Sequence, residues 1–203
     1  MSKNIGQYLK QHLVDCTALV TIGNPAYTLI EKTLLHLPHS ISIDARLIGN
    51  AITFAGIGSL STILRDHSRK YFNITQESPE SHIGIHDTAY GITFSAFAST
   101  GIYYASGIHS LEQLATGTIT AMGISVATSW LSNYSVDGFR DLIDIEPSPR
   151  LPKRIKSLSS KAKKSLGAIA IAGSLLTTGL IYKYTPTYHS VLQQTPVSKI
   201  YSQ

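Results

Sequence analysis

Charged residues are scarce in this chain, and long stretches contain none. Asp, Glu, Lys and Arg make up 14% of its 203 residues, whereas a typical soluble domain is about 25% charged. Residues 88–111 lack all four. Because a helix rises 1.5 Å per residue, roughly 20 residues cross the ~30 Å hydrocarbon core of a bilayer. The scarcity of charge therefore argues against an ordinary soluble domain and favours helices that span a membrane.

Cysteine and recognisable catalytic motifs are also missing. The single cysteine, Cys16, excludes an internal disulfide framework and metal clusters of the Cys-x-x-Cys kind. No Ser/His/Asp arrangement, phosphate-binding loop or pair of catalytic carboxylates is visible. We expect no enzyme activity, no catalytic residue, no cofactor and no metal, since His36, His39 and His109 show no spacing typical of ligands.

Five apolar segments are present, and they predict an all-α fold: a multi-pass transmembrane helical bundle of two tandem two-helix repeats (four core helices) plus a fifth C-terminal helix. The expected spans are 13–35, 43–64, 85–108, 114–136 and 165–183. The predicted order is a cytoplasmic head at 1–12, repeat 1 at 13–66, a cytoplasmic linker at 67–84, repeat 2 at 85–141, a basic proline-containing linker at 142–164, the fifth helix at 165–183 and a polar tail at 184–203.

The distribution of Lys and Arg predicts the orientation. With a cytoplasmic N-terminus, the inside pieces 1–12, 65–84 and 137–164 hold 13 of the 17 basic residues, and the outside turns 36–42 and 107–113 hold none. Basic residues collect on the cytoplasmic side of membrane proteins. We expect a protein of the plasma membrane that contacts the lipid bilayer. A soluble bundle with unusually apolar helices is the alternative.

The segment 146–164 carries three prolines and a dense run of positive charge. A basic run between two apolar spans is typical of a linker at an anionic membrane surface. A nucleic-acid-binding tail is the sharper alternative, but we expect no nucleic-acid partner.

The two halves of the chain resemble each other. Asp15 with Thr17-Ala18 matches Asp87 with Thr88-Ala89, His39-Ser40 matches His109-Ser110, and Arg65-Asp66 matches Arg140-Asp141. The offsets drift between 70 and 75 residues, but the order is the same in both halves. Since each repeat contains two spans, both enter from the same side. Internal repeats of this kind are typical of secondary transporters, whose substrate site lies at the repeat interface.

These landmarks carry a family resemblance over about residues 10–143. They are Asp15-Cys16-Thr17-Ala18, Ala45-Arg46-Leu47, Arg65-Asp66, Asp87, Ala89-Tyr90, Thr93-Phe94, and Asp137 with Arg140. In their order and spacing the chain resembles the bacterial L-alanine exporter family of small four-helix membrane proteins. It departs from that family in the second span, where Gly49-Asn50 and Gly58-Ser59 replace the usual prolines. The resemblance implies export of a small amino acid.

Asp15 and Asp87 occupy equivalent places at the expected cytoplasmic entrances of spans one and three. A carboxylate at the edge of a bilayer can take up and release protons, because desolvation favours its neutral form. The alternative is a charge favoured by the positive end of the helix dipole.

Four further residues in repeat 1 are candidates for the substrate or proton pathway. Arg46 has the fork geometry to bind a carboxylate, or it lies at the membrane surface paired with Asp44 or Glu31. Glu31 is a possible partner for a solute. Asn24 and Pro25 form either a broken helix with free carbonyls or a packed kink.

Arg65, Asp66, Asp137, Arg140 and Asp141 lie at expected cytoplasmic helix ends. We expect them to fix the topology and to form ion pairs between the halves, and a role as a gate is the further possibility.

The sequence thus predicts an exporter of a small L-alanine-like amino acid across the plasma membrane, coupled to protons. Because four helices leave little room for a path, we expect a homo-oligomer. The alternatives are a membrane scaffold or assembly protein that transports nothing, and a small channel.

Overall fold

The computed structural model describes residues 4–34, 36–75, 77–105 and 110–187, and this part of the chain contains helices and loops without a strand. The expected all-α class is therefore confirmed there. The helices are α1 (Ile5–Thr33), α2 (His39–Ile52), the π-helical turn η1 (Thr53–Ile57), α3 (Gly58–Tyr71), α4 (Glu80–Ala105), α5 (Leu111–Leu142), the short α6 (Lys153–Lys156) and α7 (Ser160–Tyr184).

Four helices of the described chain are long and apolar enough to cross a membrane. They are α1, the continuous His39–Tyr71 helix, the Leu114–Leu142 part of α5, and α7. These helices are compatible with a multi-pass membrane protein. The expected third span, which is α4, is not among the four. It has 26 residues, which is long enough, but glycine, hydroxyl residues and tyrosine dilute its aliphatic content. The predicted end of that span, 106–108, lies outside the described residues.

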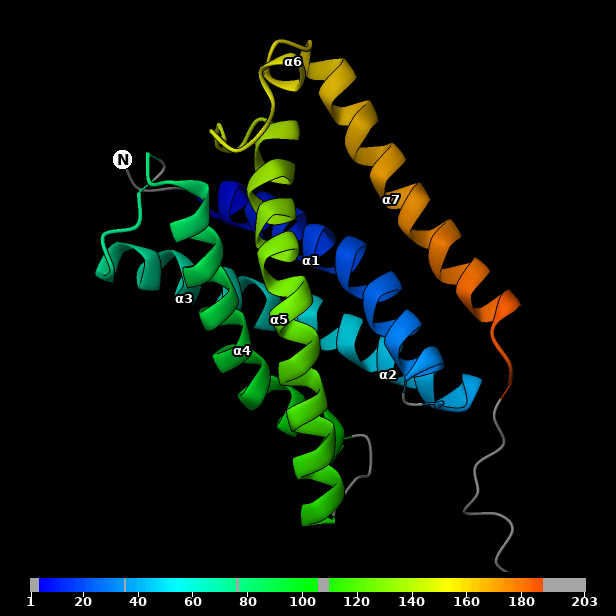
Figure 1. Ribbon diagram of the computed structural model, residues 1–203. Coiled ribbons are helices and arrows are strands. Elements are labelled where there is room, and N and C mark those ends of the chain that lie inside the picture. The colour runs from blue at the N-terminus through cyan, green and yellow to red at the C-terminus, as the bar shows by residue number, and fades with distance from the viewer. Residues whose placement is uncertain (1–3, 35, 76, 106–109, 188–203) are drawn as a thin grey trace, which may run out of the picture.

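The long helices alternate in direction, so the bundle has two ends (Figure 1). We call the end where α1, α4 and α7 begin and α3 and α5 finish the Asp15 end. The opposite end, where α1 finishes and α2 and α5 begin, is the Glu31 end. The α4 and α5 helices pack side by side, α1 packs against α5, and α7 runs along α1 at the edge of the molecule (Figure 1).

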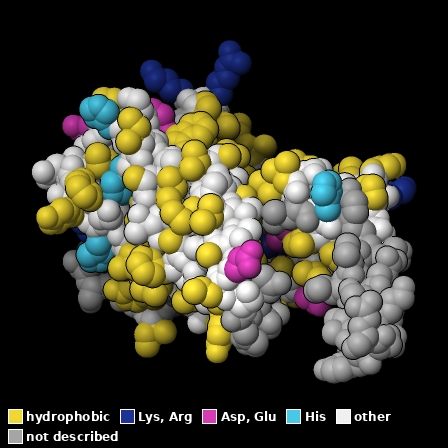
Figure 2. Space-filling model, turned by 60° about the horizontal axis from the view of Figure 1, so that its bottom comes forward, with side chains coloured by type: hydrophobic (Ala, Val, Ile, Leu, Met, Phe, Trp, Pro, Cys, Tyr) yellow, Lys and Arg dark blue, Asp and Glu magenta, His cyan; other side chains and the backbone are white. Residues whose placement is uncertain are grey.

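The interior of the described chain holds more polar than hydrophobic side chains. Among the described residues, nine hydrophobic and sixteen polar or charged side chains are buried. Large apolar side chains are exposed on every long helix, for example Leu47, Ile63, Phe97, Val126 and Leu176. Figure 2 shows hydrophobic side chains spread over one face, with Lys and Arg chiefly at its edges. Buried polar and exposed apolar groups are the informative departures from a soluble fold, and both agree with a lipid-facing surface.

The first helix begins earlier than its apolar run predicts. The Asn4 side chain accepts a hydrogen bond from the Gln7 amide at 2.9 Å, and the Gln7 side chain accepts one from the Asn4 amide at 3.1 Å. This reciprocal capping box satisfies two amides that a helix start leaves free. Residues 5–12, predicted as part of a polar head, therefore form the first turns of α1.

The break in a spanning helix lies in the second span and not in the first. The α1 helix continues through Asn24 and Pro25, so of the two alternatives at this point the structure has the packed helix and not the broken one. In η1 the backbone of Gly56 has φ of +131°, a conformation that residues with a side chain rarely adopt.

Two side chains of α1 satisfy carbonyls at this break. Cys16 Sγ donates to the Thr53 carbonyl at 3.2 Å, and His12 Nε2 donates to the Phe54 carbonyl at 2.9 Å. A Cβ atom on Gly58 would lie 2.8 Å from Cys16 Sγ, so α1 approaches this closely because position 58 lacks a side chain.

Several predicted boundaries also move. The α3 helix extends to Tyr71, inside the expected linker, and α5 extends to Leu142, so that Asp137, Arg140 and Asp141 lie within a helix and not beyond its end. The expected turn at 107–113 contains the start of α5 at Leu111, and its residues 107–109 lie outside the described chain. Of the expected tail, 188–203 also lie outside it.

Candidate functional site

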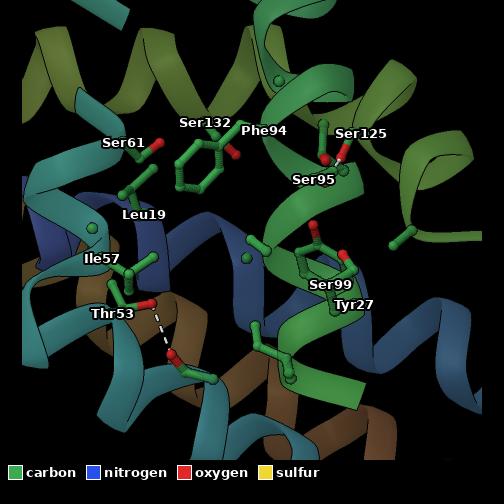
Figure 3. A pocket seen from close by; sticks show the side chains of 18 of the residues that line it. Leu19, Tyr27, Thr53, Ile57, Ser61, Phe94, Ser95, Ser99, Ser125 and Ser132 are labelled. Atoms are coloured by element: carbon green, nitrogen blue, oxygen red, sulfur yellow. Dashed lines mark hydrogen bonds between the residues drawn. The ribbon is translucent and has the colours of Figure 1, made fainter. Parts of the chain in front are cut away.

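A cavity of about 220 Å³ lies at the centre of the bundle, between α1, the α2–η1–α3 helix, α4 and α5. Apart from Arg46, its polar lining consists of serine, threonine, asparagine and tyrosine side chains. They are Asn24, Tyr27, Asn50, Thr53, Ser61, Tyr90, Ser95, Ser99, Tyr103, Ser125, Thr128, Ser129, Ser132 and Asn133. Figure 3 shows Phe94 projecting into the same space as Leu19 and Ser61. We call this space the central cavity.

Hydroxyl groups dominate the wall between α4 and α5. Ser95 and Ser125 hydrogen-bond to each other across the two helices (Figure 3). A Cβ atom on Gly91 would lie 1.8 Å from Ser129 Oγ, so the helices pack at a distance that glycine alone allows. Arg46 is the charged residue among those that line the cavity. Because serine hydroxyls both donate and accept, this wall suits a small polar solute without net charge.

At the Asp15 end, Arg140 pairs with Asp15 and Asp66, and at 3.6 Å with Glu146. Its Nε donates to Asp15 Oδ1 at 2.7 Å, and its Nη2 donates to Asp15 Oδ2 at 2.6 Å. Its Nη1 donates to Asp66 Oδ2 at 3.1 Å. Thr62 adds a fourth hydrogen bond, to Asp15 Oδ2 at 2.9 Å. Asp15 is 1% exposed, so its charge depends on these partners and not on water.

Arg69 forms a second group of the same design. Its Nε donates to Asp87 Oδ1 at 2.9 Å, its Nη2 to Asp87 Oδ2 at 2.5 Å, and its Nη1 to Asp137 Oδ2 at 3.2 Å. Each arginine thus grips one aspartate with Nε and Nη2 and a second aspartate with Nη1.

The corresponding members of the two groups are nearly equally spaced along the chain. Asp15 and Asp87 are 72 residues apart, and Asp66 and Asp137, like Arg69 and Arg140, are 71 apart. In each group the bidentate pair joins one half of the chain to the other.

Arg65 connects the two groups. Its Nη2 lies 2.7 Å from Asp66 Oδ1 and 3.0 Å from Asp137 Oδ1, and its Nη1 donates to Asn133 Oδ1 at 3.2 Å. The side chain has no exposed surface. We call this network the Asp15 layer, and we include in it Arg150, which is described next.

Arg150 reaches the same layer from the linker after α5. It donates to Glu80 Oε1 at 2.5 Å and to Asp137 Oδ2 at 2.9 Å, and its guanidinium lies over the Tyr134 ring. Burial lowers the pKa of Arg150, but the hydrogen bonds that its guanidinium donates to Glu80 and Asp137 outweigh this effect, so the pKa lies above its ordinary value. The linker therefore contacts the bundle through Arg150.

The buried charges of the Asp15 layer are stabilised because positive and negative side chains alternate. Isolated buried charges cost several kcal/mol each, and removal of one partner from a buried pair costs about 3–5 kcal/mol. In the Asp15 layer Arg65, Arg69, Arg140 and Arg150 alternate with Asp15, Asp66, Asp87 and Asp137.

A second cavity of about 480 Å³ lies on the outer side of the Asp15 layer, and we call it the vestibule. Layer residues form its inner wall, and linker residues 146–150 form part of its outer wall. The layer residues that line it are Asp66, Arg69, Asp137, Arg140 and Arg150. The two cavities share no lining residue, and Arg65 of the layer contacts Asn133 of one lining and Asp66 and Asp137 of the other.

The Glu31 end carries a smaller network. Arg46 Nη2 lies 2.5 Å from Glu31 Oε1, and Ser42 donates to Glu31 Oε2 at 2.7 Å. Tyr182 of α7 lies 3.0 Å from Ser42 Oγ, and the Arg46 guanidinium stacks over Tyr27. The buried Arg46 Nε has no hydrogen-bond partner in the described chain.

The structure thus brings most of the predicted residues together in two separate places. Asp15, Arg65, Asp66, Asp87, Asp137 and Arg140 meet in the Asp15 layer, and Glu31 and Arg46 meet at the Glu31 end. Asn24 lines the central cavity, but Pro25 does not. Asp141 pairs with Lys163 of α7, so it does not join the two halves. Asp44 is not the partner of Arg46.

Arg69, Arg150 and Ser42 are site residues that the sequence did not single out. Arg69 stands 71 residues before Arg140, and an alignment of the halves at that spacing, in place of the Arg65–Arg140 match, would have found it. Across the described residues, no group of three or more His, Cys, Asp or Glu side chains has the arrangement of a metal site.

Comparison with models of known protein families, with curated proteins and with solved structures finds no match to this chain.

Proposed function

We propose that this protein is a membrane transporter that exports a small amino acid, similar to L-alanine, across the plasma membrane in exchange for protons. One observation carries the proposal: a polar central cavity is lined by α4 and by α1, the α2–η1–α3 helix and α5, three helices able to span a membrane, and an ion-pair network lies toward each end of it. A site at the centre of the bundle with a barrier on either side is what alternating access requires.

The lining of the central cavity supports the choice of solute. Its hydroxyl and amide groups can bind a polar backbone, and Arg46 can bind a carboxylate in bidentate fashion. The free Nε of Arg46 supplies a donor that a carboxylate would satisfy, and Glu31 stands beside it to bind an ammonium group. The resemblance of residues 10–143 to the L-alanine exporter family supports the same solute and the direction of transport.

The Asp15 layer supports coupling to protons. Asp15 and Asp87 each form an ion pair with an arginine of the other half of the chain. Protonation of either aspartate would remove the charge that holds that arginine and would let the halves separate at the vestibule. The nearly equal spacing of the two groups supports two tandem repeats that rock about the central cavity.

The test is efflux of labelled alanine from proteoliposomes, with and without a proton gradient. Saturable, gradient-dependent efflux is expected from the unmodified chain. The variant Ser99→Phe, which fills the central cavity, should abolish it, whereas Thr177→Phe on the exposed surface of α7 should not. Efflux equal to that of empty vesicles would contradict the transporter and favour a scaffold. Efflux without saturation or gradient dependence would favour a channel.

A further inference from the structure

Arg65 occupies the position between the two cavities. On one side its guanidinium donates to Asn133, which lines the central cavity, at 3.2 Å. On the other side it contacts Asp66 and Asp137, which line the vestibule, at 2.7 and 3.0 Å. Arg65 itself lines neither cavity and is fully buried. Its charge thus lies in the wall that any solute must cross.

The surroundings on the two sides are unlike. The vestibule wall carries aspartates that balance its arginines, but the described lining of the central cavity contains no carboxylate. A cation that leaves the vestibule toward the central cavity therefore meets the positive charge of Arg65 and finds no negative group beyond it until Glu31 at the far end.

We infer that Arg65 is the charge barrier of this pathway, which keeps inorganic cations and free protons from crossing while solutes without net positive charge pass. The inference rests on the proposed function, because it assigns a selectivity residue to that path. A fixed arginine that excludes cations and protons from a polar pore is a known physical device. Arg65 suits the role because a guanidinium keeps its charge at any physiological pH.

A barrier role and a purely structural role for Arg65 predict different effects of its replacement on ion leakage. If Arg65 only holds α3 against α5, its replacement should lower stability without a preference for one sign of charge. If it is the barrier, its replacement should admit cations selectively, because like-charge repulsion in a poorly solvated site is far stronger than in water. Lysine keeps the charge but not the fork geometry, and so separates charge from hydrogen bonding.

The experiment measures leakage of potassium ions, protons and chloride from proteoliposomes that contain the full chain and no added amino acid. Arg65→Gln should raise the potassium and proton leak by about tenfold or more and change the chloride leak little. Arg65→Lys should stay as tight as the unmodified chain. Arg154→Gln, which removes an exposed arginine from α6, is the matched control and should also stay tight.

A second measurement covers the case in which Arg65→Gln does not fold. The double variant Arg65→Gln/Asp66→Asn removes one charge of each sign and so restores the balance of the layer. With Cys16→Ser as background, a cysteine substituted for Ser132 reports access to the central cavity from the vestibule. A membrane-impermeant cationic thiol reagent should label it about tenfold faster in the double variant than with Arg65 present.

The outcomes separate this inference from the proposed function. The barrier is overturned if Arg65→Gln leaks no more potassium ions or protons than the unmodified chain and the cysteine at position 132 is not labelled faster in the double variant. This holds even if alanine efflux is normal. Equal increases in potassium and chloride leakage also overturn it, since they indicate a general loss of packing. A selective cation leak in a chain that shows no alanine efflux supports the barrier while the transporter proposal fails.

Discussion

The two ends of the bundle hold their charges in different ways. At the Asp15 end four arginines and four aspartates share charges, and Arg65, Arg69, Arg140 and Arg150 each contact at least two carboxylates. At the Glu31 end one arginine meets one carboxylate, and the Arg46 side chain is 20% exposed with a free Nε. The difference shows that the same residue types can form a network of shared charges at one end of a helical bundle and a single, partly exposed ion pair at the other.

Replacement of Arg140 by Gln should have the largest effect on stability. It leaves Asp15 buried and without its bidentate partner, which is expected to lower the free energy of unfolding by about 3–5 kcal/mol. Thermal unfolding of the purified protein in detergent, followed by circular dichroism, measures the change.

The pair can be tested by a double-mutant cycle. Asp15→Asn together with Arg140→Gln should destabilise less than the sum of the two single variants, because neither charge is then left alone. A strictly additive result, or a loss below ~1 kcal/mol for Arg140→Gln, would contradict the account of a mutually dependent layer.

Replacement of Glu31 by Gln should have a smaller effect. Arg46 keeps its stacking on Tyr27 and its access to water, and Gln can still accept a hydrogen bond from Ser42. We expect a loss of about 1–3 kcal/mol in the same assay. If Glu31→Gln destabilises more than Arg140→Gln, the ranking of the two ends is wrong.

Replacement of Tyr182 by Phe tests whether α7 belongs to the Glu31 end. The change removes the hydroxyl that meets Ser42 at 3.0 Å and keeps the ring, so a loss of about 0.5–1.5 kcal/mol is expected. Thermal unfolding in detergent measures it, with Tyr184→Phe on the exposed end of α7 as the control. Equal effects of the two changes would remove Tyr182 from the network.

Replacement of Lys164 by Gln should have the smallest effect. Lys164 and Asp144 are 3.8 Å apart and about half exposed, so water screens their attraction and the expected loss is below ~0.5 kcal/mol. The same unfolding assay provides the baseline for surface pairs, and a loss as large as that of Glu31→Gln would show that exposure does not decide the ranking.

The sequence predicted the helices better than their contacts. Apolar run length is a local property, so it located every long helix even where its ends were misplaced. The capping box of Asn4 and Gln7 is a sequence signal for the start of α1. The prediction missed it because it assigned residues 1–12 to a polar head. The break at Gly56 was not readable in this way, since Pro25 is the stronger breaker by residue type and yet the packed helix accommodates it.

The partners of the charged residues depended on the fold. That Arg46 pairs with Glu31 was one of two alternatives, and the packing of α2 against α1 settled it. That Arg140 pairs with Asp15, 125 residues away, follows from how α5 packs on α1. Arg65 and Arg69 are one helical turn apart, and both face the layer, so the identity of the residue equivalent to Arg140 depended on a one-turn choice that short motifs could not make.

The hydrogen bond between Tyr182 and Ser42 also has a consequence for biogenesis. The two residues are 140 positions apart, and at synthesis rates of about 5–20 residues per second α7 emerges on the order of ten seconds after α2. During that interval the newly made Glu31 end lacks one of its side-chain partners. The arrival of α7 then completes it, so that the last helix of the described chain finishes a site built otherwise from α1 and α2.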